Sequence, residues 1–218
     1  MSTPANTRSE PRWTRRKEAR PEEITAAALE LFVERGFAAT RLEDVAARAG
    51  VSKGTVYLYF ANKEDLFKAV VREGLVSPIA EMKGFVEQFP GGSFALLRML
   101  ILGWWDKVGA TRISGIPKLL CGESGNFPEL VRFYLAEVVE PGQAVLTAIV
   151  RRGIARGEFR DMDPEHAAML IAAPMLQLML WRNALEPQSS YKIDPPRYLE
   201  SHLEVLVHGL GTPRAKSA

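Results

Sequence analysis

The chain has 218 residues, of which 47% are hydrophobic and 25% are charged. This length and composition are ordinary for a soluble globular protein of one or two domains, and they exclude a wholly disordered chain. The net charge of +2 does not by itself indicate a nucleic-acid partner. A single cysteine, Cys121, excludes an intramolecular disulfide and a CxxC metal site, so we expect an intracellular protein.

Residues 1–20 form a short basic arm, with six basic side chains against two acidic ones. Such an arm either binds nucleic acid or is a solvated tail, and the sequence leaves both possibilities open. The arm contains no apolar segment of the secretory type, so we expect a cytoplasmic location. The longest apolar run, residues 167–181, is shorter than the ~20 residues that a bilayer span needs. We therefore expect a helix buried in protein, and no contact with a membrane.

Helical signals begin directly after the arm. An apolar stripe at helical spacing predicts a helix over residues 21–35, which Gly36 ends. Thr40 and Glu43 match a capping box, which predicts a second helix that opens at Thr40 and ends at Gly50. Ser52 is the expected cap of a third, short helix that ends at Tyr59.

The rest of the chain is also helical in pattern. Asn62 is the expected cap of a long helix that reaches about Phe89, and a second helix follows over 94–108. Residues 111–126 are interrupted by glycine and proline, and the helix expected at 127–156 is bent or broken at Pro141-Gly142. Asp163 caps a helix to about Leu185, residues 188–194 form a loop, and a leucine stripe marks the final helix. No segment alternates like a strand, so the predicted fold class is all-α.

Residues 40–60 meet the physical requirements of a helix-turn-helix. Ala46 is small enough for two helices to cross closely, and Gly50, four residues later, suits a sharp turn with positive φ. Val56 follows six residues after Gly50 and would pack back onto the first helix. The second helix spans about 10 Å, which fits a major groove of about 12 Å. This segment therefore predicts recognition of double-stranded DNA.

Residues 21–70, about a quarter of the chain, resemble the DNA-binding domain of the tetracycline-repressor (TetR) family of transcriptional regulators. The resemblance implies a three-helix DNA-binding domain followed by a larger helical domain that binds a ligand and forms a dimer. The residues that carry the resemblance are Leu31-Phe32, Gly36-Phe37, Thr40, Asp44-Val45-Ala46, Ala49-Gly50-Val51-Ser52-Lys53-Gly54-Thr55-Val56-Tyr57, Tyr59-Phe60, Lys63-Glu64 and Leu66.

The resemblance also implies a role for individual residues in DNA binding. Thr40 and Arg41 match positions that contact the DNA backbone, and the free amides at Ser52 can bind a phosphate. Leu58 departs from the polar or aromatic residue often found at its position, which puts the base preference there in doubt. The positions expected to approach bases are Lys53, Gly54 and Thr55. The positions expected to touch phosphate are Tyr57, Tyr59 and Lys63.

The expected organisation is an arm at 1–20, a DNA-binding domain at 21–66, a ligand-binding and dimerisation domain at 67–211, and a tail at 212–218. Large apolar side chains in the second domain are either plain core or the lining of a ligand pocket. The residues expected to line the pocket are Phe85, Phe89, Met99, Trp104, Trp105, Phe133, Tyr134 and Met175. No cofactor is expected.

A helix that is apolar all round must be buried on most sides, which suggests that helix 164–185 contributes to a dimer interface. A twofold dimer would place two recognition helices on a palindromic operator, about 34–36 Å apart or a multiple of that spacing. The residues expected in this interface are Leu170, Leu178, Trp181, Leu199, Leu203, Leu206 and Leu210.

Other kinds of site have little support in the sequence. His166, His202 and His208 are not spaced as metal ligands, so we expect no metal site. No acid, base and nucleophile come together, so we expect no enzyme. Cys121 is either a small buried side chain or a redox sensor. The predicted function is a homodimeric repressor that a small apolar ligand releases from its operator; the alternatives are a regulator without such a ligand (an activator or a thiol-responsive one) and, remotely, a helical adaptor or enzyme.

Overall fold

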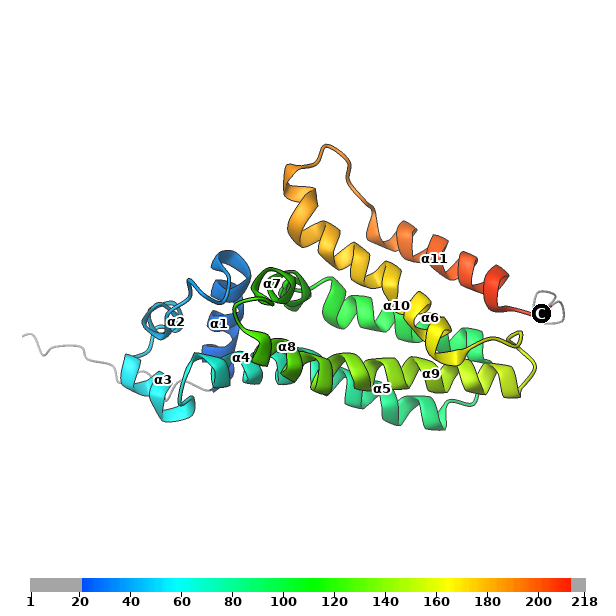
Figure 1. Ribbon diagram of the computed structural model, residues 1–218, viewed down its shortest axis with the longest axis horizontal. Helices are drawn as coiled ribbons and strands as arrows, with labels where there is room; N and C mark the ends of the chain where they lie inside the picture. Colours follow the sequence, from blue (N-terminus) through cyan, green and yellow to red (C-terminus); the bar gives the residue numbers. More distant parts are fainter. Residues whose placement is uncertain (1–20, 213–218) are drawn as a thin grey trace, which may run out of the picture.

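The computed structural model describes residues 21–212, so the predicted basic arm and most of the predicted tail lie outside the described residues. Helices make up most of this part, and its only strand-like pairing is one isolated bridge between Phe159 and Gly211. The all-α fold class is therefore confirmed. The molecule is elongated, with α1 to α3 at one end and α10 and α11 along one side (Figure 1).

A small bundle at one end contains the predicted helix-turn-helix. Its apolar centre holds the rings of Phe32, Phe37 and Phe67, whose centroids lie 5.5–5.6 Å apart. Phe60 is buried as well. The helices of this bundle are α1 (Pro21–Arg35), α2 (Leu42–Ala49), α3 (Lys53–Tyr59) and α4 (Lys63–Val71).

Three predicted caps are confirmed, and one is wrong. Ser52, Asn62 and Asp163 each accept a hydrogen bond from the backbone amide three residues later. Thr40 does not cap α2: the helix begins at Leu42, with Arg41 as an N-cap that makes no side-chain bond. The Thr40 hydroxyl is buried and donates instead to the carbonyl oxygens of Gly36 at 2.7 Å and Leu31 at 3.3 Å. It therefore closes the loop between α1 and α2.

Two long helical runs each widen into a single π-helical turn. One run passes from α4 through η1 (Arg72–Val76) into α5 (Ser77–Gln88), and the other passes from α8 (Pro128–Tyr134) through η4 (Leu135–Val139) into α9 (Glu140–Ala155). A proline follows each wide turn, at Pro78 and at Pro141. Proline has no N–H and clashes with the carbonyl four residues back, and a π turn accommodates this locally. The helix is thus widened before Pro141-Gly142 rather than broken.

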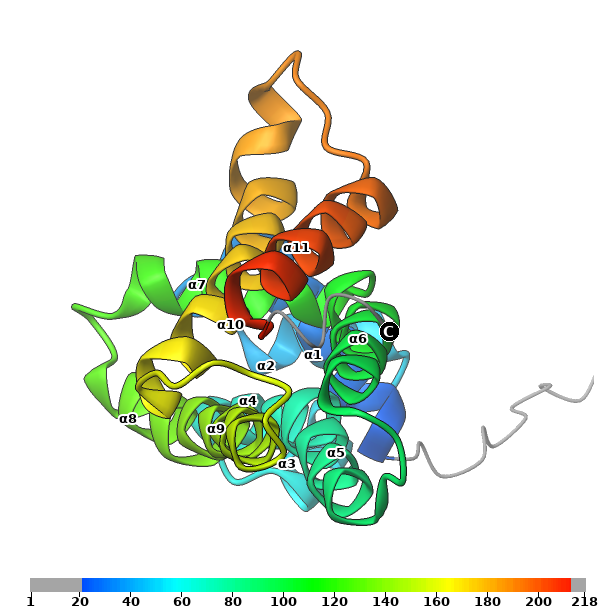
Figure 2. The ribbon, with the colours of Figure 1, turned by 90° about the vertical axis from the view of Figure 1, so that its right-hand side faces the viewer.

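The larger domain packs these runs against the remaining helices. Helix α9 lies against α5, α6 and α10, and α11 lies against α6 and α10 (Figure 2). The remaining elements are α6 (Ser93–Trp104), η2 (Trp105–Gly109), η3 (Arg112–Gly115), α7 (Ile116–Glu123), α10 (Pro164–Leu180), η5 (Trp181–Leu185), η6 (Glu186–Gln188) and α11 (Pro195–Leu210).

Two helical runs are long and apolar enough to cross a membrane by length and composition alone. They span Pro128–Ala155 and Pro164–Gln188. Both supply fully buried core residues, such as Ile149 and Leu178, and the core helices of a soluble protein show the same composition. The expected absence of membrane contact stays a prediction.

The turn between α2 and α3 requires a glycine, because Gly50 has a φ of 69°. We expect Gly50→Ala to lower the free energy of unfolding by about 1–2 kcal/mol, since a Cβ is strained in this conformation. Gly84→Ala in α5 is the matched control: a Cβ there meets no atom within 4 Å. We expect it to raise stability by about 0.5–1 kcal/mol, because alanine loses less entropy in a helix. Urea unfolding of both variants measures the two effects, and equal shifts would contradict the assignment of strain to Gly50.

Candidate DNA-binding surface and ligand cavity

Helix α3 is held by one buried residue and leaves the rest of its surface open. Val56 is fully buried against the bundle, as the helix-turn-helix pattern predicts. On the outer side Leu58 is 78% exposed and Tyr57 is 47% exposed, and Tyr59 is also exposed. Lys53 and Gly54 are exposed at the beginning of the helix. The structure therefore brings the predicted contact residues of α3 together on one open surface, although Thr55 is half-buried.

The first turn of α3 is ordered by its own polar groups. The Ser52 hydroxyl accepts from the Thr55 amide at 3.1 Å and lies 2.8 Å from the Thr55 hydroxyl. Lys53 pairs with Glu43 of α2, and this carboxylate raises the pKa of the lysine. The Lys53 ammonium also lies 5.6 Å from the centre of the Tyr57 ring. Lys53 would have to exchange Glu43 for a phosphate or a base edge on binding DNA.

Two other predicted DNA contacts differ in the structure. The buried Thr40 side chain cannot reach a DNA backbone, so that prediction is corrected, whereas Arg41 beside it is exposed. The Lys63 ammonium donates to the carbonyl oxygens of Phe37 at 2.7 Å and Ala38 at 3.1 Å. Desolvation by burial lowers its pKa. Lys63 thus ties α4 to the loop between α1 and α2, and its contact with phosphate stays a prediction.

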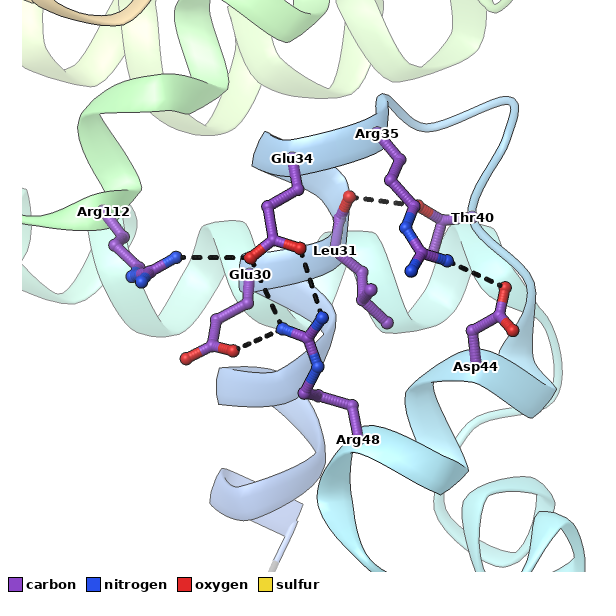
Figure 3. A network of polar contacts seen from close by, with 8 residues as sticks. All are labelled: Glu30, Leu31, Glu34, Arg35, Thr40, Asp44, Arg48 and Arg112. Carbon is purple, nitrogen blue, oxygen red and sulfur yellow. Dashed lines mark hydrogen bonds and ion pairs between the residues drawn. The ribbon is translucent and has the colours of Figure 1, made fainter.

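A charged network joins α1, α2 and the larger domain (Figure 3). Arg48 of α2 reaches Glu30 at 2.7 Å and Glu34 at 3.2 Å. Arg112 of η3 lies 3.7 Å from the other oxygen of Glu34. The hydrogen bond from Arg48 lowers the pKa of Glu34 and keeps it charged. Glu34 therefore connects the helix-turn-helix with the larger domain, although each exposed pair by itself stabilises little.

A second connection comes from the segment between α7 and α8. The Glu123 carboxylate at the end of α7 accepts a hydrogen bond from the Ala38 amide at 3.0 Å. The ring of Phe127 lies 4.8 Å from that of Phe37, edge to face. The loop between α1 and α2 is thus held on one side by Lys63 and on the other side by the larger domain.

The larger domain contains an apolar cavity of about 220 Å³. Helices α5 to α10 and the wide turn η4 contribute to its walls. Of the residues predicted to line a pocket, the cavity includes Trp104, Tyr134 and Met175.

The other five predicted pocket residues lie elsewhere. Phe85 and Phe89 pack on each other near the end of α5, with ring centres 5.5 Å apart. Met99 is exposed, Trp105 is buried beside Arg182, and Phe133 is half-buried against Arg72. Size and polarity alone could not separate lining from core. The lining residues that sequence reasoning missed are Ile79, Met82, Leu100, Ile101, Pro117, Val138, Val139, Gly142, Gln143, Val145, Leu146, Ala172, Leu176 and Met179.

Most of the predicted interface residues face their own chain. The leucine stripe of α11 packs inward on α6 and α10, so its four leucines are core, as is Leu178 of α10. Trp181 is half-buried, edge-on to Tyr191 at 5.8 Å. Of the seven residues only Leu170, which is 70% exposed, lies on an open surface. The buried residues corrected here are Leu178, Leu199, Leu203, Leu206 and Leu210.

Two smaller expectations can be compared with the described residues. Within residues 21–212, no group of three or more histidine, cysteine or acidic side chains could hold a metal ion. Cys121 lies exposed on α7, so the simpler interpretation of a small buried side chain is wrong.

Lys63 can stabilise the loop between α1 and α2, and it can contact a DNA phosphate. One variant tests both roles. We expect Lys63→Ala to lower the free energy of unfolding by about 1–3 kcal/mol, because two carbonyls lose a charged donor. Lys83→Ala on α5 is the matched control and should change stability by less than about 0.5 kcal/mol. Urea unfolding measures the loss of stability. The slope of DNA affinity against salt measures the other role, because a lost phosphate contact would flatten it by about 1.

Comparison with known proteins supports this division into a DNA-binding bundle and a larger domain. Residues 24–70 match the family model described as bacterial regulatory proteins, tetR family. Residues 97–191 match a model described as a tetracyclin repressor-like C-terminal domain.

Similar proteins extend the match over most of the chain. The transcriptional regulator RutR of Escherichia coli K12 is 31% identical over 157 residues, which is 71% of each protein. The repressor KstR2 of Rhodococcus jostii is 25% identical and covers 90% of this chain and 94% of its own. The crystal structure of FadR from Bacillus subtilis, in complex with stearoyl-CoA, superposes with a TM-score of 0.65 at 25% identity, covering 87% of this chain and 99% of that one. These relatives are regulators rather than enzymes, and the chain belongs to the TetR family of transcriptional regulators.

Proposed function

We propose that this regulator is a homodimeric repressor, acting in the cytoplasm, that a small apolar ligand releases from a palindromic operator. Residues 21–66 would read DNA, and residues 67–211 would bind the ligand and form the dimer. The boundary lies within α4, so one continuous helical run joins the two domains. The observation that carries the proposal is the open outer surface of α3 at one end of a chain that holds an apolar cavity in its larger domain.

The DNA-reading role is supported by the chemistry of α3. Its open surface offers the cation of Lys53, the phenols of Tyr57 and Tyr59 and the backbone at Gly54, with no bulky side chain at the helix start. Hydroxyls and a lysine bind phosphates and base edges in the major groove. Repression is supported by the relative KstR2, which is named a transcriptional repressor.

Release by a ligand is supported by the helical run that links the cavity to the bundle. Ile79 and Met82 of α5 line the cavity, and the same run begins with α4 beneath the helix-turn-helix. Arg72 of η1 donates two hydrogen bonds to Glu137 of η4, at 2.6 and 2.7 Å. Both walls of the cavity are therefore tied at the wide turns. A ligand that fits one separation of these walls better than another would shift the position of α4.

Dimer formation is supported by apolar side chains that the chain leaves uncovered. Met169, Leu170, Ala173 and Leu176 form an exposed row on α10, and Val205 of α11 is 67% exposed. The two helices lie side by side at the edge of the larger domain (Figures 1 and 2). Pairing two copies through this surface would bury the row on both protomers, as a twofold interface requires. This row replaces the leucine stripe of the sequence-based prediction.

The DNA-binding test is a fluorescence-anisotropy titration of a labelled duplex from the intergenic DNA beside the gene, at stated salt and with nonspecific competitor. We expect tight binding at two protomers per site that weakens steeply as salt rises. Thr55→Ala should relax sequence preference and Tyr57→Phe should weaken binding, because each removes a hydroxyl from α3. Tyr191→Phe, far along the chain on the loop before α11, is the matched control. Binding no stronger than to the competitor would contradict an operator at this position.

The dimer test uses Leu170→Lys combined with Val205→Lys. Burial of each exposed side chain in the interface would stabilise the dimer by about 1.5–3 kcal/mol, and the twofold symmetry doubles this contribution. The dissociation constant of the dimer should therefore rise at least a hundredfold in the double variant. Sedimentation should show monomers, with loss of operator binding. Phe85→Lys is a matched control, because Phe85 is also exposed but lies on α5, away from the proposed interface. A double variant that remains dimeric would exclude this surface.

A thiol-responsive regulator remains a second candidate, because Cys121 is exposed on α7 two residues before Glu123, which holds Ala38. Titration of the operator complex with a thiol oxidant tests it. Loss of DNA binding that Cys121→Ser abolishes would favour this mode of regulation over a small-molecule ligand.

A further inference from the structure

We propose that the cavity takes a compact, uncharged, largely apolar molecule with one hydrogen-bond acceptor, and that the Tyr134 hydroxyl holds this acceptor. The inference rests on the proposed function, since it names the ligand class of the cavity there assigned to the effector. It specifies the charge of the ligand, its size and the position of its hydrogen-bond acceptor.

The first step is charge. The cavity is lined by aliphatic, methionine, proline and aromatic side chains and by one glutamine, and none of these carries a charge. A carboxylate or phosphate placed there would lose its hydration without gaining a counter-charge, which is strongly unfavourable. A neutral ligand meets no such cost. The lining therefore selects against the ionised compounds that a cell contains in abundance.

The second step is that charged side chains near the cavity belong to a separate hollow. A neighbouring hollow of about 280 Å³ includes Lys83 and Glu137, and it shares Ile79 and Val145 with the cavity. Both shared side chains are buried between the two spaces. Glu137 is already paired with Arg72. Within the cavity, an anionic group is therefore separated from the Lys83 ammonium by buried apolar side chains.

The third step is the polar groups that remain. The Tyr134 hydroxyl makes no hydrogen bond with any residue in the described part of the chain, and burial raises the pKa of this phenol to about 12. It is therefore a neutral donor at any physiological pH. Gln143 uses its amide N–H on the Glu165 carbonyl oxygen at 2.9 Å, which fixes its orientation. The indole N–H of Trp104 is a second donor in the lining. Tyr134 and Trp104 are both partly accessible, and both donors can bind an acceptor oxygen of a ligand in the cavity.

The fourth step is size. A cavity of about 220 Å³ is smaller than the roughly 300–1,000 Å³ that drug-sized ligands occupy. Such a space suits one ring or a short chain with a single ketone, ester or hydroxyl group. A long acyl chain joined to a nucleotide would extend beyond this space.

The experiment compares three probes with nearly the same skeleton by isothermal titration calorimetry, without DNA. Benzylacetone is the neutral ketone, and butylbenzene lacks the acceptor. Phenylbutyrate has the same four-carbon chain, with a carboxylate at its end and a methylene at the position of the ketone. We expect benzylacetone to bind about tenfold more tightly than butylbenzene, the value of one net hydrogen bond. Phenylbutyrate should bind at least a hundredfold more weakly than benzylacetone.

Tyr134→Phe locates the hydrogen bond. We expect this variant to bind benzylacetone about as weakly as wild type binds butylbenzene, with its affinity for butylbenzene unchanged. Tyr191→Phe is the matched control and should keep all three affinities. Circular dichroism and the unfolding midpoint of both variants show whether the fold is retained. If Tyr134→Phe does not fold, the ranking of the three probes on wild type still tests the charge and the acceptor.

Several results would overturn the inference. They are stronger binding of phenylbutyrate or of decanoyl-CoA than of benzylacetone, equal binding of benzylacetone and butylbenzene, or no binding of benzylacetone up to its solubility. Failure of the proposed function gives a different result. If benzylacetone binds as expected but no bound ligand affects the operator complex, the inference about the ligand class is retained and the proposed release from DNA is contradicted.

Discussion

The buried ring of Phe37 is the contact on which the arrangement of the two domains depends. It lies among Phe32 and Phe67 of the small bundle and meets Phe127 of the larger domain edge to face at 4.8 Å. The Lys63 ammonium lies 4.4 Å from the centre of this ring while it binds the carbonyl oxygen of Phe37 itself. Aromatic pairs of this geometry add to the burial of the rings and restrict their orientation. One residue in a loop thus belongs to the cores of both domains.

This shared core gives a physical route between the cavity and α3. Pro117 of α7 and Tyr134 of α8 line the cavity, and the segment between those two helices carries Glu123 and Phe127 to the loop that contains Phe37. The run from α5 through η1 to α4 reaches the same bundle from the other side. Closely packed interiors transmit small shifts, because they cannot compress. Both routes end beneath the helix-turn-helix, so in the proposed mechanism a change at the cavity walls would be transmitted to the base of α3.

The sequence predicted well what depends on neighbouring residues and poorly what depends on distant ones. The caps Ser52 and Asp163 form because donor and acceptor lie three residues apart. The Thr40 hydroxyl instead donates to carbonyl oxygens four and nine residues earlier, so it does not cap α2. The periodicity of α11 correctly marked a buried face but could not say which surface buries it. The lining of the cavity depends on how several helices meet, so only Trp104, Tyr134 and Met175 could be recognised by their size.

Helix α10 shows why an apolar helix can serve two surfaces. Its composition leaves no polar face, and the structure divides it into a side buried in its own chain, with Ile171 and Leu178, and an open side with Leu170. A monomer would expose this second side to water at a cost proportional to its area. Leu176 is 45% exposed and also lines the cavity, so it belongs to both surfaces. In the proposed dimer the partner would cover this side chain, and association and ligand binding would then act on the same wall of the cavity.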